Sequence, residues 1–210
     1  MTLDVLSDIL EYKIVAIIRG VQPKEVPKIA ECLFAGGIRL MEVTINSPNA
    51  LGVIEEVSGQ MHNRMLIGAG TILDPDTARK AITAGASFII SPTLDAEIIK
   101  TTKKYGVVSI PGAFTPSEIF SAHSLGADIV KVFPARIGPD YIRDILAPLP
   151  HIPLMPTGGV GLDNIREFHH AGAVAFGIGS SLVNARHEMD EAYFSQLTEK
   201  ARMFVKAISN

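Results

Sequence analysis

The feature that most constrains this chain is a regular alternation of two kinds of segment. Short apolar runs, typical of strands buried on both faces, alternate with longer stretches whose apolar residues recur at helical spacing. The apolar runs occupy residues 14–19, 39–45, 66–72, 88–92, 107–112, 129–135, 153–159 and 175–180. They start roughly 20–27 residues apart, which suits one strand-plus-helix unit.

This repeat predicts an α/β protein, a (β/α)8 TIM barrel near the small end of the usual range of ~200–400 residues. A doubly wound open sheet is the alternative. The number of units favours the barrel, as does the lack of a glycine-rich dinucleotide turn after the first strand. Residues 2–12 are expected to form an extra N-terminal helix that closes the N-terminal mouth, and 188–208 the last outer helix. A length of 210 residues suits a single domain, 1–210.

Composition excludes several classes of protein. A net charge of −3 argues against a nucleic-acid surface, which needs clustered basic residues. No apolar run approaches the ~20 residues that span a bilayer, and the N-terminus does not have the pattern of a signal peptide. Cys32 is the only cysteine, which excludes intramolecular disulfides and fits a reducing cytoplasm. We therefore expect a cytoplasmic protein that binds neither nucleic acid nor a membrane.

Strand side chains alternate between two faces, so their parity indicates which ones enter the barrel. In the run IVKVFPA, Lys131 and Phe133 share one face, and Val130 and Val132 share the other. The two valines suit packing against the outer helices, so Lys131 is expected to point inward. The same reasoning predicts a wider inward set: Ile17, Arg19, Leu40, Glu42, Thr44, Asn46, Ala69, Thr71, Met155 and Thr157.

A lysine inside an apolar strand needs a physical reason. Burial lowers a lysine pKa, and an amine whose pKa falls from about 10.4 to about 7–8 becomes a nucleophile that can form a Schiff base. The alternative is that Lys131 extends to the barrel mouth or pairs with an acid. Glu42 is expected to be buried as well, with a pKa raised toward the value that a proton shuttle needs. Its alternative role is an ion pair with Lys131 or Arg19, and the two roles are compatible.

Two glycine-rich strand ends indicate an anion site. PTGGV carries Gly158 and Gly159 into a predicted helix, and GIGSS carries Gly179 and Ser180 into SLVNA. Backbone N–H groups at helix starts bind phosphate without a basic side chain. The alternative is that these glycines only permit tight turns. The histidines form no convincing metal set with carboxylates, so we expect neither a metal nor another cofactor.

Seven motifs, in order, give the chain a family resemblance. They are GGIRLMEVT, IGAGTIL, ISP, IPGAFTPSE, KVFPA, PTGG and GIGSSL, and they lie between Ile14 and about Val183. Together they closely resemble the 2-keto-3-deoxy-6-phosphogluconate (KDPG) and 4-hydroxy-2-oxoglutarate aldolases. The resemblance implies a metal-free (β/α)8 barrel that commonly forms homotrimers. It also implies a class I aldolase that cleaves KDPG, a phosphorylated keto acid of the Entner-Doudoroff pathway, to pyruvate and glyceraldehyde 3-phosphate, or 4-hydroxy-2-oxoglutarate to pyruvate and glyoxylate.

The resemblance also implies roles for individual residues. The Schiff-base lysine of the family falls on Lys131, and its proton-transferring glutamate falls on Glu42. The other implied contacts are Thr71 with the pyruvate carboxylate, Pro92 with the pocket, Phe133 with the imine, and Gly158, Gly159, Gly179 and Ser180 with the phosphate.

One departure bears on the substrate. Well-known members carry an arginine four residues after the glutamate, where this chain has Asn46, and Arg19 on the adjacent strand could supply the missing charge. The Asn-Ser-Pro run and the Arg-Gly after the first strand resemble aldolases for the galactonate-derived 4-epimer, whereas Thr157 resembles the gluconate-type enzymes. Alternatives from other classes are a phosphosugar isomerase or synthase and a non-catalytic phosphosugar-binding barrel, neither of which needs an inward lysine.

Overall fold

The structure is a computed structural model that describes residues 4–209. Strands and helices alternate along the chain, so the predicted α/β class is confirmed. The strands are β1 (Ile14–Ile18), β2 (Leu40–Thr44), β3 (Leu66–Gly70), β4 (Phe88–Ile90), β5 (Val108–Ile110), β6 (Gly112–Ala113), β7 (Val130–Val132), β8 (Leu154–Pro156) and β9 (Phe176–Ile178). The helices are α1 (Val5–Tyr12), α2 (Val26–Ala35), α3 (Ala50–Gln60), α4 (Pro75–Thr83), α5 (Ala96–Lys104), α6 (Pro116–Ser124), α7 (Pro139–Leu146), α8 (Ile165–His170) and α9 (Glu191–Ile208), with 3₁₀ turns at Pro23–Glu25 and Ala135–Ile137.

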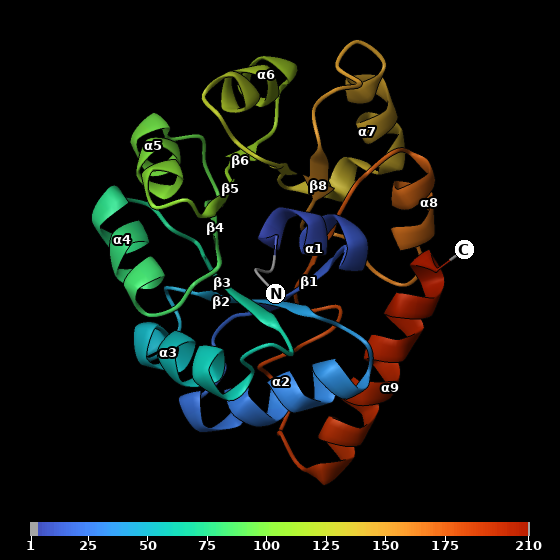
Figure 1. Ribbon diagram of the computed structural model, residues 1–210. Helices are drawn as coiled ribbons and strands as arrows, with labels where there is room; N and C mark the ends of the chain where they lie inside the picture. Colours follow the sequence, from blue (N-terminus) through green and yellow to red (C-terminus); the bar gives the residue numbers. More distant parts are fainter. Residues whose placement is uncertain (1–3, 210) are drawn as a thin grey trace.

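The strands pair in parallel in two hydrogen-bonded sheets, where the sequence predicts one closed barrel. Six strands follow the order β5-β4-β3-β2-β1-β9, and three follow the order β6-β7-β8. Pro111 separates β5 from β6, because proline has no N–H to donate to a ladder. On the other side, a single parallel bridge joins Thr157, just after β8, to Gly177 of β9. Helices α2 to α9 surround the strands in a ring (Figure 1).

Alternate strand residues fill two separate apolar clusters. An inner cluster contains Val15, Leu40, Phe88, Ile110 and Met155, one or more from each of several strands. An outer cluster lies between the strands and the helices and includes the valines that flank Lys131 on β7. The parity predicted for β7 is therefore confirmed.

The parity predicted for β3 is wrong. Ala69 belongs to the outer cluster, so the inward positions of this strand are Leu66 and the glycines at 68 and 70. A Cβ on Gly68 would lie 2.1 Å from the ring of Phe88, so only glycine leaves room for that ring. The sequence pattern predicts the wrong inward residues for β3, because glycine has no side chain that would show which face of the strand it occupies.

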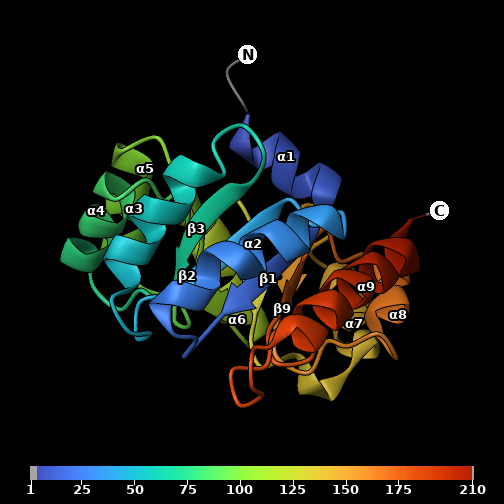
Figure 2. The ribbon, with the colours of Figure 1, turned by 90° about the horizontal axis from the view of Figure 1, so that it is seen from below.

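The N-terminal helix α1 packs against the inner cluster. Its Ile9 is fully buried there, and Val5 and Leu6 pack alongside. Figure 1 shows α1 over the centre of the helix ring, and Figure 2 shows it at one end of the strands. The extra helix predicted for residues 2–12 is thus present from Val5, while residues 2 and 3 lie outside the described part.

Four of the outer helices begin at side chains that accept hydrogen bonds from their first turn. Asp74, Asp95 and Asp190 cap α4, α5 and α9 in this way, and Thr115 with Glu118 forms a capping box on α6. These caps fix where each helix starts and so hold the preceding strand end in place. In the described part of the chain, no helix combines the length and apolar character needed to cross a membrane.

We expect Ile9→Ala to lower the free energy of unfolding by about 2–4 kcal/mol, because it leaves a cavity in the inner cluster. Leu10→Ala is the matched control on the same helix, since Leu10 is 38% exposed, and we expect a loss below about 1 kcal/mol. Denaturant unfolding of both variants measures the difference. Equal losses would show that α1 does not contribute to the inner cluster as described.

Candidate active site

A cavity of about 460 Å³ opens at the carboxyl ends of several strands. Its walls come from residues within and just after β1, β7, β8 and β9, and Figure 2 shows the loop after β9 at the end of the strands opposite α1. The structure brings a large part of the predicted site into this cavity: Arg19, Lys131, Phe133, Thr157, Gly158, Gly159, Gly179 and Ser180.

Lys131 lies at the centre of β7 and is 2% exposed. Its register pairs it with Gly112 on one side and Met155 on the other, which directs its side chain inward. The ammonium lies 5.0 Å from the ring centroid of Phe133. Burial lowers the pKa of Lys131, the nearby carboxylate of Glu42 opposes that shift, and the charge of Arg19 adds to it. A buried amine with a depressed pKa is a competent nucleophile.

Glu42 lies on β2 and is completely buried. Burial raises the pKa of its carboxyl above the ordinary value, against the opposing charges of Lys131 and Arg19. Within residues 4–209, neither carboxylate oxygen has a hydrogen-bond partner, and no ion pair joins Glu42 to Lys131. An unpartnered buried carboxylate is costly and is characteristic of functional sites. The geometry thus favours a proton-transferring group over a structural ion pair.

Gly70 makes room for this carboxyl group. A Cβ at position 70 would lie 1.9 Å from one carboxylate oxygen of Glu42 and 2.4 Å from its carboxyl carbon. Sequence reasoning counted the neighbouring alanine as the inward residue and missed this glycine. The GAG pattern of β3 was the available signal, because glycine in a strand often marks a close approach.

Arg19 and Thr71 meet at the mouth. Arg19 follows β1, and its Nη2 donates to the Thr71 hydroxyl at 3.3 Å. Thr71 follows β3 and has φ of +60°, an uncommon conformation for a β-branched residue. Strand parity would send Thr71 to the outer face with Ala69, and this left-handed turn of the backbone brings its hydroxyl to the guanidinium instead. In the described residues Arg19 makes no ion pair with an acid.

Four predicted site residues, Glu42, Thr71, Pro92 and Asn46, are not among the residues that line the cavity. Glu42 and Thr71 are next to lining residues, whereas Pro92 and Asn46 are not brought to Lys131 or Arg19 by any hydrogen bond or ion pair in the described residues. Pro92 follows β4, and its carbonyl oxygen would lie 2.4 Å from a Cβ on Gly112, the residue paired with Lys131. The backbone of Pro92 therefore packs against β6, the strand beside Lys131. Asn46 lies beyond the end of β2 and is exposed, and the structure does not bring it to the cavity. Its strand ends at Thr44, so inward parity no longer applies two residues later.

The glycine-rich segments form turns, where the sequence predicts helix starts. Gly158 and Gly159 have φ of +81° and +97°, and α8 begins only at Ile165. Asn164 ties this loop together by donating to the Gly159 carbonyl and accepting from Gly161 N–H, both at 2.9 Å. After Gly179 a single turn closes through Leu182 N–H, and no described helix follows before α9. These backbone groups therefore lack the added field of a helix N-terminus.

Sequence reasoning missed several polar residues of the cavity wall. Arg136 comes from the 3₁₀ turn after β7, and Asn184 and Arg186 come from the loop between β9 and α9. Asp163 is the acidic residue among the wall residues. These positions follow strand ends by several residues, where neither parity nor helical spacing gives a direction. The KVFPAR and NAR sequences offer only a basic residue near a strand end as a signal.

The fold and the site together are those of an α/β protein with a buried amine in a cavity at the carboxyl ends of parallel strands, which is where enzymes of this architecture place their chemistry. The family model described as "KDPG and KHG aldolase" matches residues 5–197. The chain belongs to this family and is therefore an aldolase, a lyase.

Named relatives agree on the reaction and differ in the sugar acid. A 2-dehydro-3-deoxy-6-phosphogalactonate aldolase of Escherichia coli is 32% identical, over 92% of this chain and 93% of the relative. A 2-dehydro-3-deoxy-phosphogluconate aldolase of Pseudomonas aeruginosa is 34% identical, over 75% and 72%. A solved KDPG aldolase of Legionella pneumophila, with pyruvate captured as a covalent carbinolamine intermediate, superposes with a TM-score of 0.82 at 28% identity, covering 98% of each chain.

We expect Gly70→Ala to fold and to lose turnover by roughly 10²-fold, because the added methyl displaces the carboxyl group of Glu42 and small misplacements in a site are that costly. The control is Gly59→Ala on α3, where a Cβ meets nothing within 4 Å. Steady-state aldol cleavage and thermal unfolding of both variants give the comparison. Turnover of Gly70→Ala within a few-fold of wild type would show that the position of Glu42 is not critical.

Proposed function

We propose that this protein is a class I aldolase that forms a Schiff base through Lys131 and cleaves KDPG to pyruvate and glyceraldehyde 3-phosphate. The observation that carries the proposal is the pair of buried ionisable groups, Lys131 and Glu42, which lie close enough to shift each other's pKa without forming an ion pair. A structural lysine would be paired, and a phosphosugar-binding barrel would have no use for a depressed amine pKa.

The chemistry follows from these two groups. The amine of Lys131 adds to the C2 ketone, and loss of water gives an iminium ion. The C3–C4 bond then breaks, its electrons move toward the iminium nitrogen, and an enamine remains. Glu42 accepts the proton of the C4 hydroxyl through a water molecule, so the aldehyde leaves, and it later helps to return a proton to C3. Hydrolysis of the resulting imine releases pyruvate and restores the amine.

Different residues from those that act on the reacting carbons bind the two ends of the substrate. Arg19 and Thr71, joined at the mouth, hold the carboxylate next to the imine. The turns at Gly158, Gly159, Gly179 and Ser180 offer backbone N–H groups to the distal phosphate. Binding the unreactive phosphate orients the reacting bond and so contributes to the rate.

The proposal extends to the architecture. The two sheets act as one closed (β/α)8 barrel in a single domain, with Pro111 interrupting one edge and the Thr157–Gly177 bridge joining the other. A homotrimer completes the assembly, and the half-exposed ring of Phe120 on α6 is one of the apolar side chains that a partner copy would cover.

The galactonate-derived 4-epimer is the second candidate substrate. The E. coli galactonate-type relative is as similar to this chain as the gluconate-type relatives are. Against it stands Thr157, which is 3% exposed and lines the cavity. Its hydroxyl donates to the Met155 carbonyl at 3.4 Å, which leaves its oxygen to accept a hydrogen bond from the substrate. A hydroxyl in that position can hydrogen-bond one C4 configuration and not the other.

We expect wild type to cleave the gluconate-derived acid faster than its 4-epimer, and Thr157→Val to lower that ratio of kcat/KM about two- to ten-fold, the worth of one hydrogen bond. Thr102→Val is the matched control, since Thr102 is buried on α5 and bonds only the Ile98 carbonyl. Assays with both epimers and with 4-hydroxy-2-oxoglutarate give the ratios. Faster cleavage of the 4-epimer by wild type would replace the proposed substrate.

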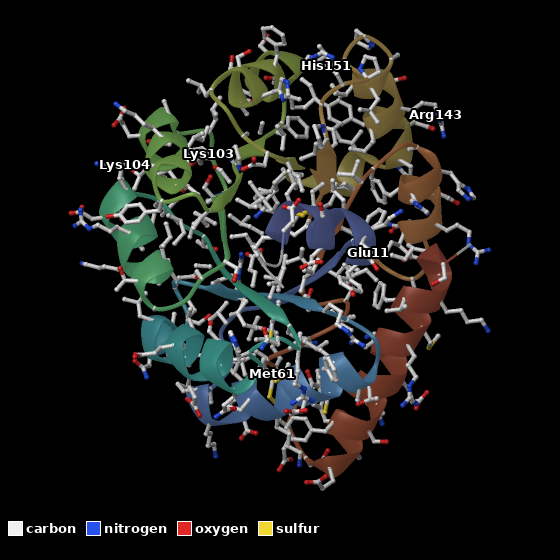
Figure 3. The ribbon with its side chains drawn as sticks, viewed as in Figure 1. Glu11, Met61, Lys103, Lys104, Arg143 and His151 are labelled. Atoms are coloured by element: carbon white, nitrogen blue, oxygen red, sulfur yellow. The ribbon has the colours of Figure 1, made fainter. Side chains whose placement is uncertain are left out.

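Pyruvate with borohydride should attach irreversibly to Lys131, because the neutral amine attacks the ketone. Peptide mass mapping locates the adduct. Lys103 and Lys104, in the last turn of the outer helix α5, serve as internal controls (Figure 3). Labelling should fall as pH falls through the lowered pKa, with a midpoint below the ordinary value of 10.5. Adducts on the α5 lysines, or none, would overturn the assignment and favour a binding barrel.

The same midpoint should move in opposite directions in two variants. Glu42→Gln removes a charge that favours the ammonium form, so the pKa of Lys131 should fall and the midpoint should move to lower pH. Arg19→Ala removes a charge that disfavours it, so the midpoint should move to higher pH. Labelling rates across pH measure both shifts. Shifts of the same sign would mean that these groups do not act on Lys131 through their charges.

Arg19→Ala should also weaken pyruvate binding by about 1.5–3 kcal/mol, the worth of a charged hydrogen bond. Asn46→Ala should cost less, because Asn46 is exposed and lies away from the cavity wall. Asn46→Arg in the Arg19→Ala background should recover part of the loss. The pyruvate concentration that half-saturates labelling measures each affinity. Unchanged affinity in Arg19→Ala, with lower thermal stability, would assign Arg19 a structural role only.

A further inference from the structure

We propose that Arg136 and Arg186 form a two-arginine clamp on the distal phosphate and set a preference for phosphorylated over unphosphorylated keto acids. The inference rests on the proposed function and adds residues that the backbone turns do not supply. Both arginines line the cavity together with the glycine turns.

Arg136 lies directly over one of these turns. A Cβ on Gly159 would meet the Arg136 side chain at 2.9 Å and its Cα at 3.3 Å. Glycine at position 159, with φ of +97°, is therefore what permits the arginine to approach. The contact places the stem of Arg136 against a turn that lines the cavity.

Arg186 belongs to a loop that is tied to α9. Its backbone N–H donates to Oδ1 of Asn184 at 3.1 Å, and the backbone N–H of Asn184 donates to the Tyr193 hydroxyl of α9 at 3.2 Å. Two successive contacts thus hold the arginine at the cavity wall rather than leaving it on an unattached loop.

Neither guanidinium has an acidic partner. Four other exposed arginines in residues 4–209, namely Arg64, Arg79, Arg143 and Arg202, pair with carboxylates. Arg136 and Arg186 make no ion pair with a described residue. The cavity wall carries Arg19, Lys131, Arg136 and Arg186 against one carboxylate, that of Asp163, in a chain whose net charge is −3.

A dianion at the cavity's glycine turns needs this charge. The turns are not helix N-termini, so they offer neutral N–H groups without a helix field. A phosphate carries a charge of about −1.5 to −2 near neutral pH, and guanidinium groups match it with paired donors. An unphosphorylated acid leaves both guanidiniums in water and gains nothing from them.

The experiment compares Arg136→Gln, Arg186→Gln, the double variant and the control Arg143→Gln, whose side chain lies on the periphery of α7 (Figure 3). The first readout is the ratio of kcat/KM for KDPG to that for its unphosphorylated counterpart. Each single variant should lower the ratio roughly ten-fold, and the double variant roughly hundred-fold, from the worth of charged hydrogen bonds. The control should stay within two-fold of wild type.

The second readout does not depend on catalysis. Calorimetric titration with inorganic phosphate should show weaker binding in the double variant than in wild type, and salt should weaken wild-type binding more steeply. Arg136→Lys should restore part of the affinity lost in Arg136→Gln. Wild-type selectivity and phosphate affinity in the double variant would overturn the clamp. If wild type cleaves neither acid, the proposed aldolase activity fails, and the phosphate titration alone then decides for or against the clamp.

Discussion

The active site depends on the burial of two ionisable side chains among parallel strands without an ion pair between them. Lys131 and Glu42 are both almost or wholly buried, and burial moves their pKa values toward each other, one down and one up. Each group is destabilising by itself. Burial of the inner and outer apolar clusters offsets the free-energy cost of burying these two groups, so the fold remains stable although the site destabilises it.

Glycines, which have no side chain, determine the geometry of the site as much as its charged residues do. Gly70 leaves space for the Glu42 carboxyl group, and Gly177 leaves space for the side chain of Thr157. Each of these glycines lies on a strand next to the residue that it accommodates, so the neighbouring strand sets the position of the functional group. The positive φ of Thr71 has a related effect, because it returns a side chain to the mouth after its strand has ended.

The same cavity separates chemistry from recognition. The lysine and glutamate come from the strands themselves, whereas most of the residues proposed to bind the two ends of a substrate come from turns and loops. Relatives named for either sugar acid are each about a third identical to this chain over the aligned residues.

The sequence by itself determined the α/β class, the alternation of strands and helices, and the inward direction of Lys131, Phe133 and Glu42. It could do so because strand parity is a local property that burial on one face makes visible. Only the tertiary structure decided that Ala69 faces outward and that Asn46 lies away from the cavity. It also decided that the glycine-rich segments are turns, not helix starts, and that two arginines lie on the same cavity wall. Glycine has no side chain, so the sequence does not show which face of a strand it occupies. The alternation of side chains ends where the strand ends, and beyond that point the direction of a loop side chain depends on the distant segments against which the loop packs.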